Sequence, residues 1–457
     1  MSLWTASDAA AATGGAAPGD WAATGLSIDT RSIAPGELFV ALTDARDGHD
    51  FAAQALEKGA AAVLVSRLPE GVPAERALLV DDVQAALEAL GRAGRARARA
   101  KVIAITGSVG KTSAKEMARH ALAPQGAVHA AVKSFNNHWG VPLTLAAIPA
   151  DADFAVVEVG MNHPGEIAPL ARQAAPDVGL VTTVAPVHLE AFADGIEGIA
   201  REKAALFEGL GPGGIGLYNA DLDVSPILAA RGTTPFGRTA PDWRLREVHA
   251  GPDAVTCAAE TPEGALAFRI GAPGAHFALN ALGVLAACHF AGADLARAAL
   301  ALADWAPPAG RGQRHSVRLG PDAQPVDLID DAYNANPASV GAALDLLASA
   351  PVRKRGRRVA FLGDMKELGP TGPALHAALA EHEAAGALDA VHCVGPLMRH
   401  LHDALGPDQR GHWTETSEAM ARHLRDAVRP GDAVLVKGSL SMDMARLVAG
   451  IRNLGEG

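Results

Sequence analysis

The stretch Lys101-Val-Ile-Ala-Ile-Thr-Gly-Ser-Val-Gly-Lys-Thr-Ser113 carries the residue types that bind nucleotide phosphates. An apolar run leads into a glycine-rich turn, which is followed by a lysine, a hydroxyl and a helical pattern. In such a turn, backbone N–H groups point at phosphate oxygens, and the helix N-terminus adds partial positive charge. We therefore predict a nucleotide-binding loop made of Gly107, Ser108, Val109, Gly110, Lys111, Thr112 and Ser113.

Two residues of this loop have separate predicted roles. Lys111 is expected to reach the β- and γ-phosphates, and the Thr112 hydroxyl is expected to ligate Mg²⁺. The spacing departs from the general G-x-x-x-x-G-K-[ST] form, because Ile105 stands where the first glycine would be. An ordinary glycine turn is the alternative, but the apolar run before it and the helical pattern after it favour phosphate binding.

Further chemistry-bearing side chains follow the next apolar runs. Glu158 ends the run 154–159, and a carboxylate at that place suits Mg²⁺, which prefers oxygen ligands. His188 follows the run 178–184. Lys203 has apolar neighbours on a predicted helix, and burial would lower its pKa and favour a neutral amine that CO₂ can carbamylate. For each of the three, a solvent-exposed side chain is the alternative.

The segment 330–337 starts at the end of a predicted strand and runs into a predicted helix. Asp331 and Asn336 are therefore candidates for nucleotide contacts, because ligands bind at the carboxyl ends of parallel strands. Helix capping by Asn336 or Ser339 is the alternative, and both roles are compatible.

Cations near the predicted domain boundary and at the end of the last strong strand complete the candidate set. Arg311 lies just past the breaker cluster Pro307-Pro-Ala-Gly310, so it could meet a γ-phosphate when two domains close. Lys437 ends the last strong apolar run and, with Ser439, could contact phosphate or a substrate carboxylate.

Alternating apolar and helical patterns predict an α/β protein of three domains. We place a small N-terminal α/β domain at residues 1–98, a doubly wound, mostly parallel P-loop domain at 99–308, and a Rossmann-like α/β domain at 309–457. A helix is expected over 84–100, with its four arginines on a solvated face: Arg92, Arg95, Arg97 and Arg99.

Composition narrows the class of protein. The 457 residues carry a net charge of −11, which argues against a general nucleic-acid binder. Three widely spaced cysteines form neither a disulfide framework nor a metal-ligand spacing, so we expect a reducing cytoplasm. The start lacks a basic, apolar leader, and no long uncharged apolar run occurs, so neither a signal peptide nor membrane insertion is expected.

Taken together, blocks along nearly the whole chain resemble the Mur ligase family. Residues 29–31, 35–42 and 47–51 resemble its N-terminal uridine-nucleotide domain, and 106–112 its P-loop. Phe135-Asn-Asn137 with 140–144, 158–163 with 165–167, and 188–190 resemble the segments that follow it. Blocks 330–337, 362–369 and 436–442 resemble the branch that adds D-alanyl-D-alanine.

The resemblance implies an ATP-dependent ligase of the bacterial cytoplasm, expected to be a monomer. It would join D-alanyl-D-alanine to UDP-N-acetylmuramoyl-tripeptide through an acyl phosphate, in peptidoglycan precursor synthesis. Lys111, Lys203, His188 and Arg311 would be catalytic. Two Mg²⁺ ions would be held by Thr112 with Glu158 and by His188 with carbamylated Lys203. The nucleotide would also contact Asn280, Arg311, Asp331 and Asn336. Substrate would contact Asp29, Thr30, Arg31, Asn136, Asn137, Asn162, Lys437 and Ser439.

Two features fit this resemblance less well, and two rival functions are alternatives to it. Asp29, Thr30 and Arg31, taken alone, are typical of a solvated loop. Phe277 stands where the family often has Asn, so the resemblance leaves the adenine contacts open; the ring could pack on adenine instead, while Asn280 still matches. A folylpolyglutamate synthase-like ligase is one rival, which the domain ahead of the P-loop disfavours. A nucleotide-binding scaffold without catalysis is another, which the intact candidate set disfavours.

Overall fold

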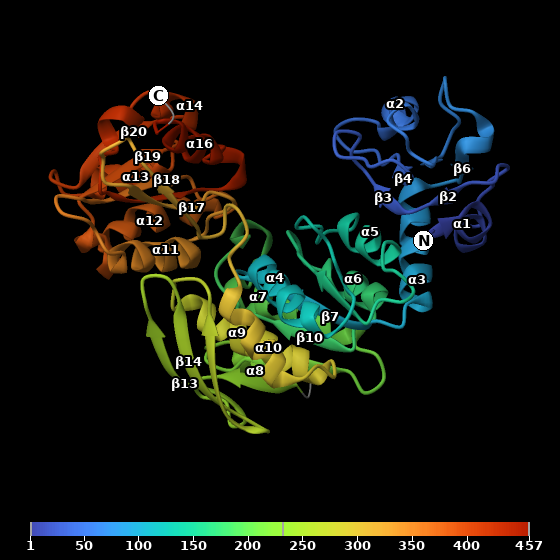
Figure 1. The fold of residues 1–457 in the computed structure, drawn as a ribbon, viewed down its shortest axis with the longest axis horizontal. Helices are drawn as coiled ribbons and strands as arrows, with labels where there is room; N and C mark the ends of the chain where they lie inside the picture. Colours follow the sequence, from blue (N-terminus) through green and yellow to red (C-terminus); the bar gives the residue numbers. More distant parts are fainter. Residues whose placement is uncertain (1, 231–232, 456–457) are drawn as a thin grey trace.

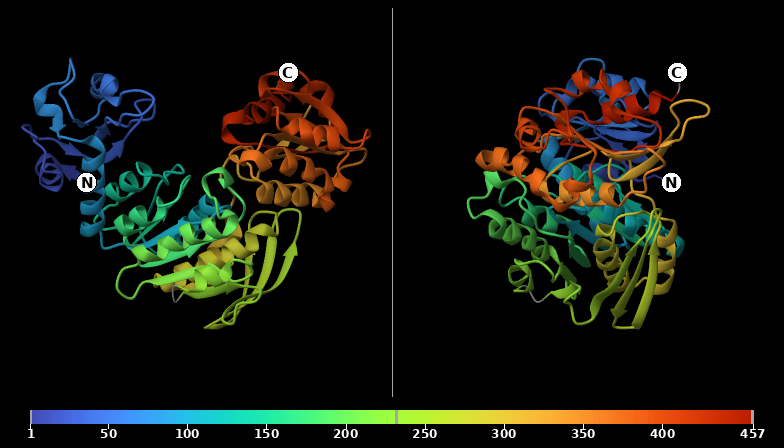
Figure 2. Two further views of the ribbon diagram at one scale, coloured as in Figure 1. Left: turned by 180° about the vertical axis from the view of Figure 1, so that it is seen from behind. Right: turned by 90° about the vertical axis from the view of Figure 1, so that its left-hand side faces the viewer.

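The computed structural model describes residues 2–230 and 233–455. The outer limits of the first and last expected domains, residues 1 and 457, therefore lie outside the described residues. The chain forms three lobes, and the N-terminal and C-terminal lobes stand at opposite ends of a central one (Figure 1 and Figure 2). The predicted α/β class and three-domain organisation are confirmed.

The N-terminal lobe is built on a parallel four-stranded sheet of order β3-β4-β5-β6, with a small antiparallel pair β1-β2 beside it. Its strands are β1 (Trp4–Thr5), β2 (Ala22–Ala23), β3 (Gly25–Ser27), β4 (Glu37–Val40), β5 (Ala62–Val65) and β6 (Ala77–Leu79). Its helices are α1 (Ala6–Thr13), α2 (Ala52–Glu57) and α3 (Val83–Arg97). Asp82 caps α3, which packs against α5 (Gly140–Ala146) of the central lobe.

The central lobe contains a nine-stranded sheet of order β15-β14-β13-β12-β11-β10-β7-β9-β8. Its parallel strands are β7 (Lys101–Thr106), β8 (Val128–Ala130), β9 (Phe154–Glu158), β10 (Val178–Val181), β11 (Ile215–Asn219), β12 (Thr234–Gly237) and β13 (Trp243–Ala250). The strands β14 (Val255–Thr261) and β15 (Gly264–Ile270) add to β13 in antiparallel fashion. This antiparallel extension was not predicted.

Helices cover both faces of the parallel part of this sheet. They are α4 (Lys111–Leu122), α5, α6 (Ile167–Ala174), α7 (Gly195–Ala204), α8 (Ser225–Ala229), α9 (His276–Phe290) and α10 (Leu295–Ala301). Along β7, Ile103 and Ile105 enter the core shared with α4 and α9, whereas Val102 and Ala104 enter the core shared with α6 and α7. Burial on both faces explains why β7 reads as a continuous apolar run.

The C-terminal lobe has a six-stranded sheet of order β16-β17-β21-β18-β19-β20, parallel except for β16. The strands are β16 (Gln313–Val317), β17 (Val326–Asp331), β18 (Arg358–Gly363), β19 (Ala390–Val394), β20 (Arg410–Thr414) and β21 (Ala433–Lys437). The helices are α11 (Pro337–Ser349), α12 (Gly372–Ala377), α13 (Met398–Ala404), α14 (Ser417–Ala421), α15 (Leu424–Ala427) and α16 (Ala445–Asn453). The sequence predicts strands from apolar runs at 326–331, 358–363, 390–394 and 433–437, and β17, β18, β19 and β21 have these bounds.

The helix expected over 84–100 is α3, which ends at Arg97, and the prediction that its four arginines form a solvated face is wrong for two of them. Arg92 and Arg99 are exposed, but the Arg97 guanidinium lies over the Trp4 ring at 3.9 Å and donates to the carbonyls of Leu3 and Ala146. Arg95 donates to the carbonyls of Ala174 and Ala175 and pairs with Asp177. These carbonyls come from tertiary neighbours, which helix periodicity does not reveal. Both arginines therefore fasten α3 to the central lobe.

Among residues 2–230 and 233–455, no helix has both the length and the apolar character needed to cross a bilayer. The three cysteines are buried free thiols.

Candidate functional site

The turn between β7 and α4 has two positions where only glycine fits. Gly110 has φ +86° and precedes the first residue of α4, in the left-handed region where a side chain is strained. A Cβ there would lie 2.7 Å from the Asn280 amide nitrogen, and one on Gly107 would lie 2.0 Å from the Thr182 hydroxyl. The backbone therefore carries no side chain at these two positions, which allows a phosphate to approach it closely.

Lys111 is the first residue of α4, and its ammonium stays close to the turn. Its Nζ donates to the Gly107 carbonyl at 2.6 Å. Burial lowers the pKa of Lys111, while the nearby Glu158 carboxylate opposes that shift. A desolvated cation at this place interacts strongly with an anion, because little water screens it.

Thr112 and Glu158 place two side-chain oxygens in contact in a buried position. The Thr112 hydroxyl donates to Glu158 Oε2 at 2.9 Å, and the Asn136 amide donates to Glu158 Oε1 at 2.8 Å. Glu158 is 1% exposed. A buried carboxylate and a hydroxyl in contact fit Mg²⁺, which takes oxygen ligands and keeps several waters. Within residues 2–230 and 233–455, no group of three or more His, Cys, Asp or Glu side chains is arranged to hold a metal ion.

A cavity of about 390 Å³ lies between this turn and the C-terminal lobe. It gathers eleven of the fourteen predicted nucleotide and metal residues, and Gly107, His188 and Lys203 are outside its lining. From the central lobe it is lined by Ser108, Val109, Gly110, Lys111, Thr112, Ser113, Asn136, Glu158, Asn162 and Asn280. From the C-terminal lobe and its linker it is lined by Arg311, Asp331, Asn336 and Lys437.

Arg311 bridges the two lobes at this cavity. Its guanidinium lies 4.1 Å over the Tyr333 ring and donates to the Ser134 hydroxyl at 3.1 Å. Ser134 in turn lies 3.0 Å from the Thr112 hydroxyl. The Arg311 guanidinium is thus connected to the Thr112 hydroxyl through the Ser134 hydroxyl.

Asp331 and Lys437 form an ion pair on the C-terminal side of the cavity, with a Nζ–Oδ2 distance of 2.6 Å. Burial raises the pKa of Asp331, although Lys437 and Arg311 act in the opposite direction. Lys437 also donates to the Asn334 carbonyl at 2.9 Å. Asn336 caps α11 in a reciprocal pair with Ser339, so the capping alternative is correct while Asn336 also lines the cavity.

Lys203 and His188 lie outside the lining of this cavity. Lys203 is 1% exposed, and burial together with the Lys111 cation lowers its pKa well below the ordinary value. A buried amine with a lowered pKa fits carbamylation, because the reaction with CO₂ needs an unprotonated nitrogen. His188 Nδ1 lies 2.5 Å from Glu367 Oε2, a residue of the C-terminal lobe.

The remaining substrate candidates are separated from the turn. Arg31 pairs with Asp29 and lowers the pKa of that carboxyl to about 2, and Thr30 donates to Gln54. All three lie in the N-terminal lobe. Asn137 accepts from the first residues of α5, and Ser439 is buried and accepts from the Lys366 backbone.

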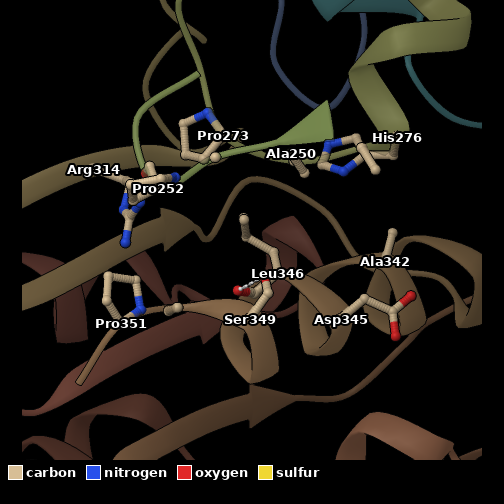
Figure 3. Close-up of a pocket in the computed structure, with 14 residues that line it drawn as sticks. Ala250, Pro252, Pro273, His276, Arg314, Ala342, Asp345, Leu346, Ser349 and Pro351 are labelled. Atoms are coloured by element: carbon tan, nitrogen blue, oxygen red, sulfur yellow. Dashed lines mark hydrogen bonds between the residues drawn. The ribbon is translucent and has the colours of Figure 1, made fainter. Parts of the chain in front are cut away.

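A second cavity of about 460 Å³ adjoins the first (Figure 3). It lies between the loops flanking β13–β15 and one side of α11, and the two cavities share His276, Ala342 and Leu346. His276 was not predicted as a site residue. Burial lowers its pKa to about 4, so the imidazole is neutral at pH 7.

Sequence reasoning also missed Ser134, Tyr333 and Asn334, which line the cavity beside predicted residues. Tyr333 and Asn334 fall inside the block 330–337, so their proximity to Asp331 was available from the sequence. Ser134 precedes the Phe135-Asn-Asn137 block, and no spacing pattern singled it out.

Comparison with known proteins assigns this chain to a family. Residues 22–97 match the Mur ligase family catalytic domain, 105–288 the Mur ligase middle domain, and 313–440 the Mur ligase glutamate ligase domain. A curated Escherichia coli K12 protein named UDP-N-acetylmuramoyl-tripeptide–D-alanyl-D-alanine ligase is 35% identical, with 94% of each chain covered.

Solved structures agree with this match. A crystal structure of MurF from Acinetobacter baumannii superposes with a TM-score of 0.84 at 26% identity, covering 98% of this chain and 99% of that one. The Thermotoga maritima MurF ligase in complex with ADP gives 0.78 at 25% identity, covering 94% and 98%. The chain belongs to the Mur ligase family. Within that family, its full-length similarity is to ligases that add D-alanyl-D-alanine.

The Gly110→Ala variant tests the geometry of the turn. We expect it to bind an ATP analogue at least about tenfold more weakly in titration calorimetry, because the new methyl group displaces Asn280. Gly292→Ala is the matched control, since Gly292 has φ +87° and open space around it. Both variants should lose about 1–2 kcal/mol of stability from left-handed strain, and equal nucleotide affinity in both would contradict the assigned geometry.

Proposed function

We propose that this chain joins D-alanyl-D-alanine to the terminal carboxylate of UDP-N-acetylmuramoyl-tripeptide and hydrolyses ATP to ADP and phosphate in doing so. The observation that carries the proposal is the interlobe cavity, where Lys111, Thr112, Glu158 and Arg311 meet. The near full-length similarity to curated ligases of that name supports the choice of substrates.

The residues of the cavity suit phosphoryl transfer to a carboxylate. This chemistry depends on aligning two anions and neutralising their charge, with little covalent help from the protein. Lys111 neutralises transferred phosphate from the side of the turn, and Arg311 does so from the side of the linker. Asn280, Asp331 and Asn336 hold the nucleotide between the lobes.

Mg²⁺ belongs to the proposal as a cofactor. When bound, it would supply positive charge to the phosphates and draw the acceptor carboxylate toward them. Thr112 and Glu158 would hold one ion; His188 and a carbamate on Lys203 would hold a second. The burial and lowered pKa of Lys203 support the carbamate.

Amide formation then requires the acyl phosphate to react with the dipeptide amine before water hydrolyses it. The cavity is lined by both lobes, so docking of the C-terminal lobe would exclude water and bring Arg311 into place. Asp29, Thr30 and Arg31 would bind the uridine nucleotide. Asn137, Asn162, Lys437 and Ser439 would contact the peptide part of the substrates, with Asn136 fixing Glu158.

We further propose domain boundaries at 98/99 and 308/309, and a monomer that works in the bacterial cytoplasm. The boundaries fall between the sheets described above, and the free, buried cysteines support a reducing compartment.

Phosphate release tests the proposed activity. We expect the parent protein to release phosphate from ATP only when UDP-N-acetylmuramoyl-tripeptide and D-alanyl-D-alanine are both present. Lys111→Ala should slow turnover by about 100-fold or more, because a preorganised charge at the transferred phosphate is lost. Lys354→Ala, which removes an exposed lysine, is the control. Release without the dipeptide would favour another ligase, and no release would favour a binding protein.

Carbamylation of Lys203 has its own test. After incubation with [¹³C]bicarbonate, the parent protein should show a carbamate carbon resonance that Lys203→Arg lacks, since a guanidinium does not react with CO₂. Degassed, CO₂-free buffer should reduce turnover of the parent, and bicarbonate should restore it. A spectrum without that resonance, with activity indifferent to CO₂, would disprove the carbamate.

A further inference from the structure

One ion pair joins the loop after β10 to the loop after β18, across the two lobes. His188 Nδ1 lies 2.5 Å from Glu367 Oε2, with 23% of the His188 side chain and 54% of the Glu367 side chain exposed. Glu367 belongs to the block 362–369, which the sequence singled out and for which no role has been given so far.

Both partners of this pair have left-handed backbones, with φ 54° at His188 and φ 63° at Glu367. Non-glycine residues avoid this region, and they persist in it where surrounding structure fixes them, often at functional sites. An exposed ion pair contributes little by itself, less than the cost of holding two such residues left-handed. The two left-handed backbones must therefore be held by other contacts of each loop, and those contacts place the two side chains opposite each other.

The loop that carries His188 is tied to the phosphate-binding turn. The Ser108 backbone donates to the Thr183 carbonyl at 2.8 Å, and the Ser108 hydroxyl bonds both the carbonyl and the N–H of Ala185 at 3.0 Å. The Thr182 hydroxyl donates to the Val109 carbonyl at 2.8 Å. The segment just before His188 is thus hydrogen-bonded to the turn.

The loop that carries Glu367 is fixed equally well within the C-terminal lobe. Asp364 is fully buried and accepts from the Met398 backbone at 2.8 Å. The Met365 N–H donates to the buried His376 ring, and the Lys366 N–H donates to the Ser439 hydroxyl, each at 2.9 Å. The carboxylate is therefore presented to the central lobe from a rigid support.

We propose that Glu367 is a positioning residue that orients the His188 ring from the opposite lobe. A carboxylate 2.5 Å from Nδ1 favours the tautomer that carries its proton on Nδ1, and this tautomer leaves Nε2 free to bind a metal ion. The inference rests on the proposed function, in which His188 is a metal ligand. It adds that this ligand is oriented only when the C-terminal lobe is docked, so the ring is aligned at the moment Arg311 is in place.

Magnesium dependence at saturating ATP and both substrates tests this role. We expect Glu367→Ala to raise the Mg²⁺ concentration for half-maximal turnover by about tenfold or more, as loss of an outer partner of a metal ligand does. Glu367→Gln, which keeps a neutral acceptor, should fall between Glu367→Ala and the parent. The exposed Glu381→Gln in the same lobe is the matched control. An unchanged Mg²⁺ dependence in Glu367→Ala would overturn the proposal.

A second readout needs neither metal nor turnover. In protein labelled with ¹⁵N-histidine, two-bond ¹H–¹⁵N correlation reports the tautomer of each ring, and His188→Gln identifies the His188 signal. We expect the Nδ1–H tautomer in the parent and a shift toward Nε2–H in Glu367→Ala. The same tautomer in both would overturn the proposal. If the parent released no phosphate, the proposed function would fail, and the tautomer would still decide the positioning role.

Discussion

The tight turn between β7 and α4 is the constraint on which the rest of the structure depends. Its backbone has to pass close to Thr182 and Asn280 without a side chain at Gly107 or Gly110. The Thr182 hydroxyl, just after the neighbouring strand β10, donates to the turn, and α4 begins directly at Lys111. The parallel sheet thus serves to hold one turn and its neighbouring strand ends in a fixed relation.

Charge balance explains why two lobes are needed. The turn contributes one half-buried lysine, and the pKa of the buried Lys203 is lowered by burial and by the Lys111 cation. In the proposed function, further positive charge for a triphosphate would come from Arg311 in the linker. Stacking on Tyr333 and a hydrogen bond to Ser134 hold its guanidinium near Thr112. The C-terminal lobe would thus help to complete the positive charge around the phosphates.

Much of the fold was predictable because its strands are buried on both faces. Apolar runs at 215–219, 326–331, 358–363, 390–394 and 433–437 predict strands, and their bounds are those of β11, β17, β18, β19 and β21. The antiparallel strands β14 and β15 were missed, because they alternate between buried and exposed residues and lack the glycine-rich signal of the turn. Arg97 was misjudged because its partners, Trp4 and Ala146, are distant in sequence.

The candidate site was predictable where chemistry is local in sequence. Thr112, Glu158 and Arg311 were singled out from strand ends and a linker, and they line one cavity. Ser134, which connects Arg311 to Thr112, was not found, because a lone serine in a loop carries no pattern. The role of Glu367 was equally hidden, since it depends on which loop of the other lobe its own loop meets.

The central claim is that a phosphate held at the turn is transferred to a carboxylate before the amide forms. The most direct measurement follows oxygen-18 from the terminal carboxylate of labelled UDP-N-acetylmuramoyl-tripeptide during complete turnover with ATP and D-alanyl-D-alanine. Mass spectrometry of the released phosphate should find a carboxylate oxygen in it, because the bond broken by the amine lies between the acyl carbon and that oxygen. Phosphate free of the label, alongside normal amide formation, would contradict the account.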